Sequence, residues 1–179
     1  MNNTLSIDSR FSLKAFQKAY DVVGDVALRT PLQHNLEWSE RYDCNVFLKR
    51  EDLQPVRSYK LRGAYHKMTK LDQWKKDAGV ICASAGNHAQ GVAYSCSLLK
   101  IYGHIYMPVT TPKQKVDKVR RFGGEWVKVY LEGDSFEQAK ESALRSARKS
   151  NYSFVHPYDD EDIILGQGTV GLELLDQVE

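Results

Sequence analysis

The spacing of apolar residues predicts several short elements in the first third of this chain. Apolar side chains recur every three or four positions over 12–23, the period of a helix that buries one face, and Gly24 ends the pattern. A second helix is predicted over 35–42, a strand over 45–49, and then a third helix that Ser58 would cap. This part of the chain therefore offers helices but few strands.

From residue 79 onward the pattern changes to a regular alternation of strands and helices. Such alternation is typical of right-handed βαβ units, which build a parallel sheet with helices on both faces. The last helix is predicted to begin near Asp159 or near Gly168. The predicted strands lie at 80–83, 104–107, 126–130 and 153–155, and the predicted helices between them run from 88 to 99, up to the glycines at 123–124, and up to about 149.

Composition and charge exclude several classes of partner. The chain has 179 residues, of which 42% are hydrophobic and 27% charged, as in an ordinary globular protein of one domain or two small lobes. Its net charge of +2 creates no overall field for nucleic acid. No apolar run approaches the roughly 20 residues that a membrane helix needs. We expect neither a nucleic-acid nor a membrane partner, and we interpret the basic run at 113–121 as a solvated helix face.

The cysteines and histidines indicate a reducing environment without a metal site. The three cysteines are scattered and lack a CxxC spacing, which argues against a disulfide framework. The five histidines are dispersed and form no metal-ligand motif. The first residues lack the basic start and apolar core of a signal peptide. We therefore expect a cytoplasmic protein without a bound metal.

Lys60 is the first candidate for chemistry. A free lysine has a pKa near 10.4, so its amine attacks a carbonyl only when burial or a nearby cation lowers that pKa. Tyr59 and Leu61 can bury the amine, and Arg62 can add positive charge. Taken alone, the segment is more typical of a surface lysine with a buried stem.

A turn of small polar residues is the second candidate. It follows a buried strand and opens into a helix, a position at which α/β proteins bind ligands and free amides favour an anion. Its glycine lets the backbone approach a ligand closely, and its asparagine can bond a polar ring substituent. The alternative is a simple helix cap, and the following His88 is either a general base or a structural residue. The turn consists of Ser84, Ala85, Gly86 and Asn87.

Residues 166–171 match the GxGxxG pattern of dinucleotide-binding folds. The preceding residues 159–162 are too acidic for a buried strand, and the sequence ends before the acidic ribose partner expected about 20 residues further on. We therefore interpret these glycines as helix-start and close-packing residues rather than as a nicotinamide or flavin site.

Five ordered motifs together resemble the serine/threonine dehydratases, which are pyridoxal-phosphate enzymes with the fold of the tryptophan-synthase β-subunit. The resemblance is strongest to the threonine ammonia-lyases (threonine dehydratases), covers about residues 12–179, and does not decide between threonine and serine, because serine racemases look similar. The motifs lie at 48–54, 58–64, 84–93, 107–113, and 156–160 leading to 166–169.

The resemblance also implies a domain organisation of parallel three-layer αβα sheets. Residues 1–75 would form the N-terminal part of a large cofactor domain, 76–150 a small α/β domain, and 151–179 a return into the large domain. The glycine-rich loop that holds the cofactor phosphate in the family, and the partner of the pyridine nitrogen, do not occur in the sequence. We expect the large domain to be incomplete here and the complete protein to be a homo-oligomer.

The roles of single residues follow from the same resemblance. Lys60 would hold pyridoxal 5'-phosphate as a Schiff base and abstract the α-proton of the substrate. Tyr59 would pack against the cofactor ring, Asn87 would bond the ring hydroxyl, and the backbone of Ser84–Asn87 would grip the substrate carboxylate. The implied reaction converts L-threonine to 2-oxobutanoate and ammonia by β-elimination of water. The alternatives are a catalytically incompetent fragment and a relative of the serine dehydratases or racemases.

Overall fold

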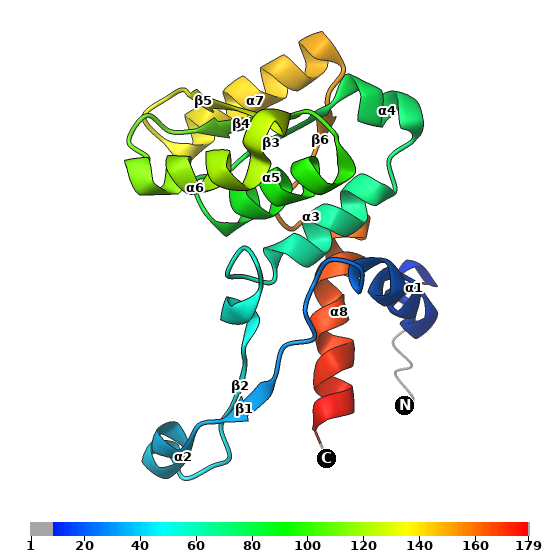
Figure 1. Cartoon of the computed structure of the whole chain (residues 1–179), viewed down its shortest axis with the longest axis vertical. Helices are drawn as coiled ribbons and strands as arrows, with labels where there is room; N and C mark the ends of the chain where they lie inside the picture. The colour runs from blue at the N-terminus through cyan, green and yellow to red at the C-terminus, as the bar shows by residue number, and fades with distance from the viewer. Residues whose placement is uncertain (1–8, 179) are drawn as a thin grey trace, which may run out of the picture.

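The computed structural model describes residues 9–178. A parallel sheet with its covering helices forms one end of the molecule, and helices α1 and α8 and a thin arm form the other (Figure 1). The strands are β1 Leu32–His34, β2 Phe47–Lys49, β3 Val80–Ala83, β4 Gly103–Met107, β5 Val127–Leu131 and β6 Ser153–Phe154. The α-helices are α1 Leu13–Val23, α2 Leu36–Tyr42, α3 Lys60–Thr69, α4 Gln73–Ala78, α5 Asn87–Leu99, α6 Lys113–Gly123, α7 Phe136–Ser150 and α8 Glu161–Gln177, and the 3-10 helices are η1 Ser9–Phe11, η2 Glu51–Leu53 and η3 Gly124–Trp126.

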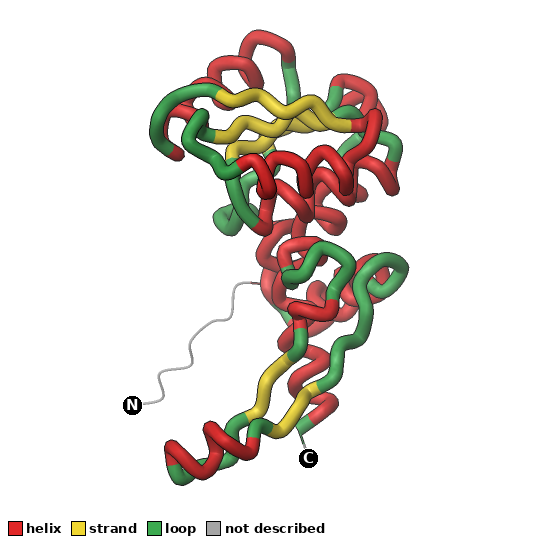
Figure 2. The backbone as a smooth tube through the Cα atoms, turned by 60° about the vertical axis from the view of Figure 1, so that its left-hand side comes forward, coloured by secondary structure: helices red, strands yellow, loops and turns green. Residues whose placement is uncertain are grey.

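The sheet has the strand order β5-β4-β3-β6, and each neighbouring pair is parallel. Because successive residues of a strand face opposite sides, Val80 and Cys82 join the core that α5 and α6 cover, whereas Ile81 and Ala83 join the core beneath α7. Figure 2 shows the strands lying between these helix layers. The predicted parallel three-layer αβα architecture is therefore confirmed.

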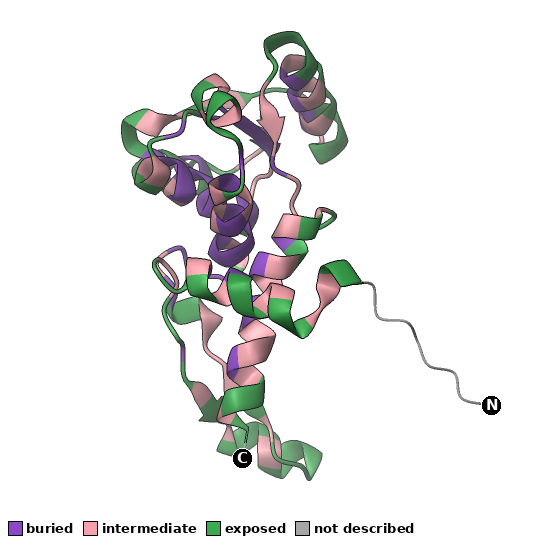
Figure 3. Cartoon of the chain, turned by 90° about the vertical axis from the view of Figure 1, so that its right-hand side faces the viewer, coloured by how far each residue is buried: buried purple, intermediate pink, exposed green. Residues whose placement is uncertain are grey.

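The buried residues concentrate at the sheet end of the molecule, and most of α5 is buried against α3 and α6 (Figure 3). The arm, by contrast, is a two-stranded antiparallel ribbon that carries the exposed helix α2 at its tip. Within residues 9–178, no helix is both long enough and apolar enough to cross a membrane.

Most helix boundaries follow the sequence signals. Ser12 caps α1 by accepting a hydrogen bond from the Ala15 amide, and Asn35 caps α2 in the same way. Helix α8 begins directly after Asp160, so the earlier of its two predicted starts is confirmed. Strand β1 was not predicted, because three residues are too few to show an alternating pattern and the strand depends on its pairing with β2.

The predicted cap at Ser58 is wrong. A cap residue directly precedes the first turn with extended backbone. Here Tyr59, with helical dihedral angles φ −68° and ψ −9°, stands between Ser58 and the start of α3 at Lys60. The Ser58 hydroxyl is instead buried and has no hydrogen-bond partner among the described residues.

The GxGxxG segment lies inside α8 rather than at a strand–helix turn, so it is no dinucleotide-binding loop and its predicted helix-start role is wrong. Its close-packing role is confirmed. A Cβ atom added to Gly166 would lie 2.7 Å from both the Arg62 carbonyl oxygen and the Gly63 Cα, and one added to Gly168 would lie 2.3 Å from the Phe16 ring. These glycines therefore let α8 approach α3 and α1.

We predict that Gly166→Ala destabilises the protein by about 2 kcal/mol, because an extra methyl group in a packed helix contact costs roughly 1–3 kcal/mol. Gly171→Ala is the matched control in the same helix, since its added Cβ would meet no atom within 4 Å. Alanine favours a helix interior over glycine by roughly 0.5–1 kcal/mol, so this variant should be at least as stable as the parent. Urea unfolding measures both changes, and equal midpoints would contradict the packing role.

Candidate active site

Lys60 is the first residue of α3, and its amine is only partly buried. Its Nζ atom donates a hydrogen bond of 2.7 Å to the carbonyl oxygen of Pro157 and lies 5.3 Å from the centroid of the Tyr59 ring. Among the described residues, no carboxylate forms an ion pair with this amine. The amine is thus held by a neutral oxygen, from which it can be released without separating an ion pair.

The turn from Ser84 to Asn87 lies between the end of β3 and the start of α5. The Gly86 amide donates to the Ser84 hydroxyl oxygen at 3.2 Å, and Asn87 is exposed as the first helical residue. A Cβ atom added to Gly86 would meet nothing within 4 Å, so the turn borders open space. The first amides of a helix have no partners within it, and they favour an anion in that space.

Close packing of α3 on α5 places the backbone of Lys60 against the helix that begins at the turn. A Cβ atom on Gly91 would lie 3.0 Å from both the carbonyl carbon and the carbonyl oxygen of Lys60, so only glycine fits there without displacing the backbone of α3. The same packing places Lys60 near His88, whose pKa the lysine charge helps to lower.

His88 is nearly inaccessible to solvent, and its Nε2 atom lies 2.9 Å from the Val155 carbonyl oxygen. A carbonyl only accepts, so Nε2 carries the proton and Nδ1 is an unprotonated nitrogen, buried without a partner among the described residues. Burial, followed by the charges of Lys60 and His156, lowers the pKa of His88 to about 4. These features favour a structural role over a general base, whose pKa would lie nearer neutrality.

The prediction that Arg62 adds positive charge to Lys60 is wrong. Arg62 is 1% exposed and forms a two-pronged ion pair with Glu51, with both N···O distances 2.9 Å. Its third nitrogen donates to Glu173 at 2.7 Å. Two carboxylates therefore face this guanidinium and leave no surplus charge to act on Lys60.

Lys49 belongs to the same buried cluster of charges, which we call the Arg62 group and which consists of Lys49, Glu51, Arg62 and Glu173. Its amine donates to Glu173 and, at 2.6 Å, to the carbonyl oxygen of Thr30. Two cations and two carboxylates thus join β2, η2, α3 and α8. Burial opposes the ionisation of Glu51, but the hydrogen bonds from Arg62 and Thr30 outweigh it and hold the pKa of Glu51 below its usual value. The motif at 48–54 was visible in the sequence, but the sequence did not show that its Lys49 and Glu51 form ion pairs with Glu173 and Arg62.

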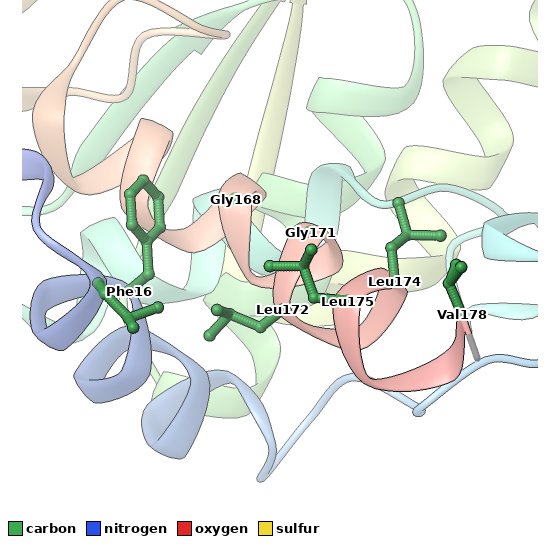
Figure 4. Close-up of a pocket in the computed structure, with 8 residues that line it drawn as sticks. Phe16, Gly168, Gly171, Leu172, Leu174, Leu175 and Val178 are labelled. Carbon is green, nitrogen blue, oxygen red and sulfur yellow. The ribbon is translucent and has the colours of Figure 1, made fainter. Parts of the chain in front are cut away.

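An apolar groove runs along α8 beside α1 (Figure 4), and neither Lys60 nor the Ser84–Asn87 turn lines it. It has a volume of about 650 Å³, and none of its lining residues carries a charged or nucleophilic group. Leu175 and Val178 are largely exposed along it. The groove is lined by Leu13, Phe16, Gly168, Gly171, Leu172, Leu174, Leu175 and Val178. We therefore place the candidate chemistry at Lys60 and not in this groove.

Comparison with known proteins decides the family. The model of the pyridoxal-phosphate dependent enzymes matches residues 23–179. The chain belongs to this family. It is 50% identical over 179 residues to the L-threonine dehydratase biosynthetic IlvA of Bacillus subtilis, covering 100% of this chain and 42% of that protein. It is 46% identical to the Lactococcus lactis protein of the same name, over 94% of this chain and 40% of that protein.

Solved structures of pyridoxal-phosphate dependent enzymes share the fold. The processed threonine deaminase isoform 2 of Solanum lycopersicum superposes with a TM-score of 0.85 at 43% identity, covering 97% of this chain and 47% of that chain. Maize serine racemase superposes with a TM-score of 0.86 at 30% identity, covering 93% of this chain and 50% of that chain. The predicted tryptophan-synthase β-like fold class and the predicted family cofactor are thus confirmed, and the chain spans about half the length of these structures or less.

The residues around Lys60 fit the reactive end of pyridoxal phosphate. Within residues 9–178 the Lys60 amine has no ion pair to break, and the buried Ser58 hydroxyl and His88 Nδ1 have no hydrogen-bond partner. The turn at Gly86 borders open space. Lys60 would hold the cofactor covalently, with Tyr59 and Asn87 beside its ring. These roles stay predictions. The structure adds to the sequence-based set the Pro157 carbonyl, which accepts from Lys60, and the carboxylates of Glu51 and Glu173, which pair with Arg62.

We predict that His88 makes folding stability depend on pH. Its pKa is about 4 in the folded protein and 6.5 in the reference state, so the unfolded chain binds the extra proton and stability falls as pH drops from 6.5 toward 4. A shift of this size corresponds to a loss of about 2–3 kcal/mol between pH 7.5 and 4.5. Urea unfolding at several pH values measures it.

His88→Gln is the matched variant, because the glutamine amide can still donate to the Val155 carbonyl oxygen but does not titrate. Its stability should fall less over the same pH range, even if it is lower throughout. The pKa values of His104 and His156 are also lowered by burial, and these residues remain in both proteins. An unchanged pH slope in the variant would refute the assignment.

Proposed function

We propose that this chain carries the lysine-bearing part of a threonine ammonia-lyase, which converts L-threonine into 2-oxobutanoate and ammonia. The observation that carries the proposal is the packing of the Lys60 backbone against Gly91 of α5, the helix that begins at the Gly86 turn, in a chain 50% identical over its full length to a protein named L-threonine dehydratase. A reactive amine next to an anion-binding turn suits an amino-acid substrate, because its carboxylate can bind the turn.

The backbone amides of the Ser84–Asn87 turn would hold the carboxylate of threonine. Gly86 contributes by leaving the space above the turn open, and the Asn87 side chain, exposed at the helix start, would bond the ring hydroxyl of the cofactor. Tyr59 would pack against one face of the ring with its aromatic surface. These contacts orient the substrate so that its Cα–H bond faces Lys60.

Lys60 would perform the proton transfer at the substrate Cα atom. Pyridoxal phosphate, when bound, supplies an electron sink that stabilises negative charge at this carbon. Once the substrate amine has displaced Lys60 from the cofactor, the free Lys60 amine would take the Cα proton and pass it to the hydroxide that leaves Cβ, so that water departs. The released enamine would then take up a water molecule to give 2-oxobutanoate and ammonia. His88, with its lowered pKa, stays neutral and supports the loop at Val155.

We also propose the domain division 1–75, 76–150 and 151–179. Strands β3, β4 and β5 and helix α7 fall in the middle part, whereas α8 packs against α1 and α3 of the first part. A cytoplasmic location and a homo-oligomeric complete protein belong to the same proposal.

Two observations keep alternatives in view. The chain spans 42% of its Bacillus relative, so the first alternative is that these 179 residues do not catalyse the reaction by themselves. The likeness to maize serine racemase favours serine as a second substrate. Threonine and serine deamination should be compared by kcat/KM in any active preparation.

We predict that pyridoxal phosphate added to the purified chain modifies Lys60. Borohydride should fix the label, and peptide mass spectrometry should locate it on Lys60 because this amine is partly buried and free of carboxylate partners. Lys60→Ala should lower labelling at least tenfold. Lys70→Ala, which removes an exposed lysine at the end of the same helix, is the control and should label normally. Preferential labelling of other lysines would refute the role of Lys60.

Activity separates the main proposal from the incompetent fragment. The chain should be assayed for 2-oxobutanoate formation alone and together with the part of the Bacillus subtilis relative that follows the aligned segment. Activity that depends on Lys60 in either preparation supports the proposal. Labelling of Lys60 without threonine deamination in both would favour the incompetent fragment.

A further inference from the structure

A short loop joins the end of β6 to the start of α8 and carries the carbonyl group to which the Lys60 amine donates. We call residues 155–160 the seat loop. At its first residue the fully buried Val155 donates its amide to the Ile81 carbonyl oxygen of β3, at 2.8 Å. At its last residue the Asp160 carboxylate caps α8 by accepting from two amides of the first turn. Both ends of the loop are therefore tied to regular structure.

The middle of the seat loop is closed by its own histidine. The His156 Nδ1 atom accepts hydrogen bonds from the amides of Tyr158 and Asp159, at 3.3 and 2.7 Å. The residue inside this turn is Pro157, which has no N–H group and whose ring fixes the backbone angle φ. Pro157 therefore presents its carbonyl oxygen from a constrained backbone, and this oxygen accepts from Lys60 Nζ at 2.7 Å.

Three contacts join α3, α5 and the seat loop in a closed circuit. His88 and Gly91 lie about one turn apart on α5. The buried His88 ring donates to the Val155 carbonyl oxygen at 2.9 Å, and Gly91 packs against the backbone of Lys60. The Lys60 amine closes the circuit by donating to the loop. Helix α5 thus sets the backbone of the lysine directly and the place of its amine through the loop.

The neutral partner leaves the Lys60 amine able to act as a base. A carbonyl oxygen only accepts hydrogen bonds, so Nζ is the donor in this contact. A neutral amine that donates one N–H group keeps its lone pair free to take a proton. A carboxylate partner would instead favour the charged ammonium form, which has no lone pair. The seat loop can therefore hold the amine without blocking the proton transfer proposed for it.

We infer that the seat loop holds the free Lys60 amine in its reacting position, and that His88 is the positioning residue that keeps the loop there. This inference rests on the function proposed for Lys60. His88 touches none of the reacting atoms, because its ring contacts the carbonyl of Val155 and acts on the amine through Pro157. Its burial keeps water from competing for this hydrogen bond.

Four variants separate this hydrogen bond from general effects on folding. His88→Leu removes the donor to the Val155 carbonyl, whereas His88→Gln keeps an amide that can donate. His156→Ala opens the turn around Pro157 at a partly exposed position and leaves α5 unchanged. Ile105→Val, in the buried strand β4, is the stability control, since removal of one buried methylene costs about 0.5–1.5 kcal/mol.

Two labels on the full chain test the inference, under conditions where urea unfolding curves show every variant to be folded. Pyridoxal phosphate fixed by borohydride reports whether the amine is placed to meet a bound carbonyl. Trace acetylation by acetic anhydride, without cofactor, reports how freely the amine reacts. Peptide mass spectrometry gives each label as the ratio of Lys60 to the exposed Lys70. His88→Leu and His156→Ala should lower the first ratio at least threefold and raise the second at least threefold.

His88→Gln and Ile105→Val should keep both ratios within about twofold of the parent. Unchanged ratios in His88→Leu, a shift of both labels in the same direction, or equal shifts in His88→Gln or Ile105→Val would overturn the positioning role. A parent chain that takes up no pyridoxal phosphate at Lys60 would refute the proposed function alone. The acetylation ratio would then decide the seat loop by itself, and its failure to rise in His88→Leu would overturn the inference.

Discussion

The buried charge of Arg62 is the constraint on which the rest of the site depends. A guanidinium with 1% exposure is tolerable only if each of its nitrogens faces an acceptor, and Glu51 and Glu173 meet this need from two different elements. Because Lys60 lies two residues earlier on α3, the same contacts fix where the reactive amine stands. Folding stability and the placement of Lys60 are thus coupled through one ion-paired group.

This group also explains why distant motifs occur together. Lys49 and Glu51 belong to the motif at 48–54, and Thr169 of the motif at 166–169 lies 3.2 Å from an Arg62 nitrogen. The sequence presents these segments as separate signatures more than 100 positions apart. In the structure these segments are neighbours, because Glu51 of the first and Thr169 of the second both accept hydrogen bonds from Arg62. Their close approach requires the glycines of α8.

The sequence predicted the fold well where local signals were strong. The alternation from residue 79 onward, the glycine stop at 123–124 and the predicted helices over 12–23 and 35–42 all correspond to observed elements. It failed at Ser58, because the position of a cap depends on the dihedral angles of the next residue and not on residue type alone.

The site was predictable only in outline. Lys60 and the Ser84–Asn87 turn were recognisable because lysine chemistry and helix-start amides are local properties. The fate of the Arg62 charge and the partner of His88 were not, since each depends on a residue from another element.

Gly91 carries a consequence for how such an enzyme can change. Its missing side chain sets the clearance between the helix that presents the amine and the helix that begins at the anion-binding turn, since a single Cβ atom would press on the Lys60 carbonyl at 3.0 Å. Position 91 therefore acts as a spacer that fixes the gap between α3 and α5. Under the role proposed for Lys60, selection for catalysis would act on this residue although it lies outside the proposed ligand contacts, and a search for specificity determinants limited to ligand contacts would overlook it.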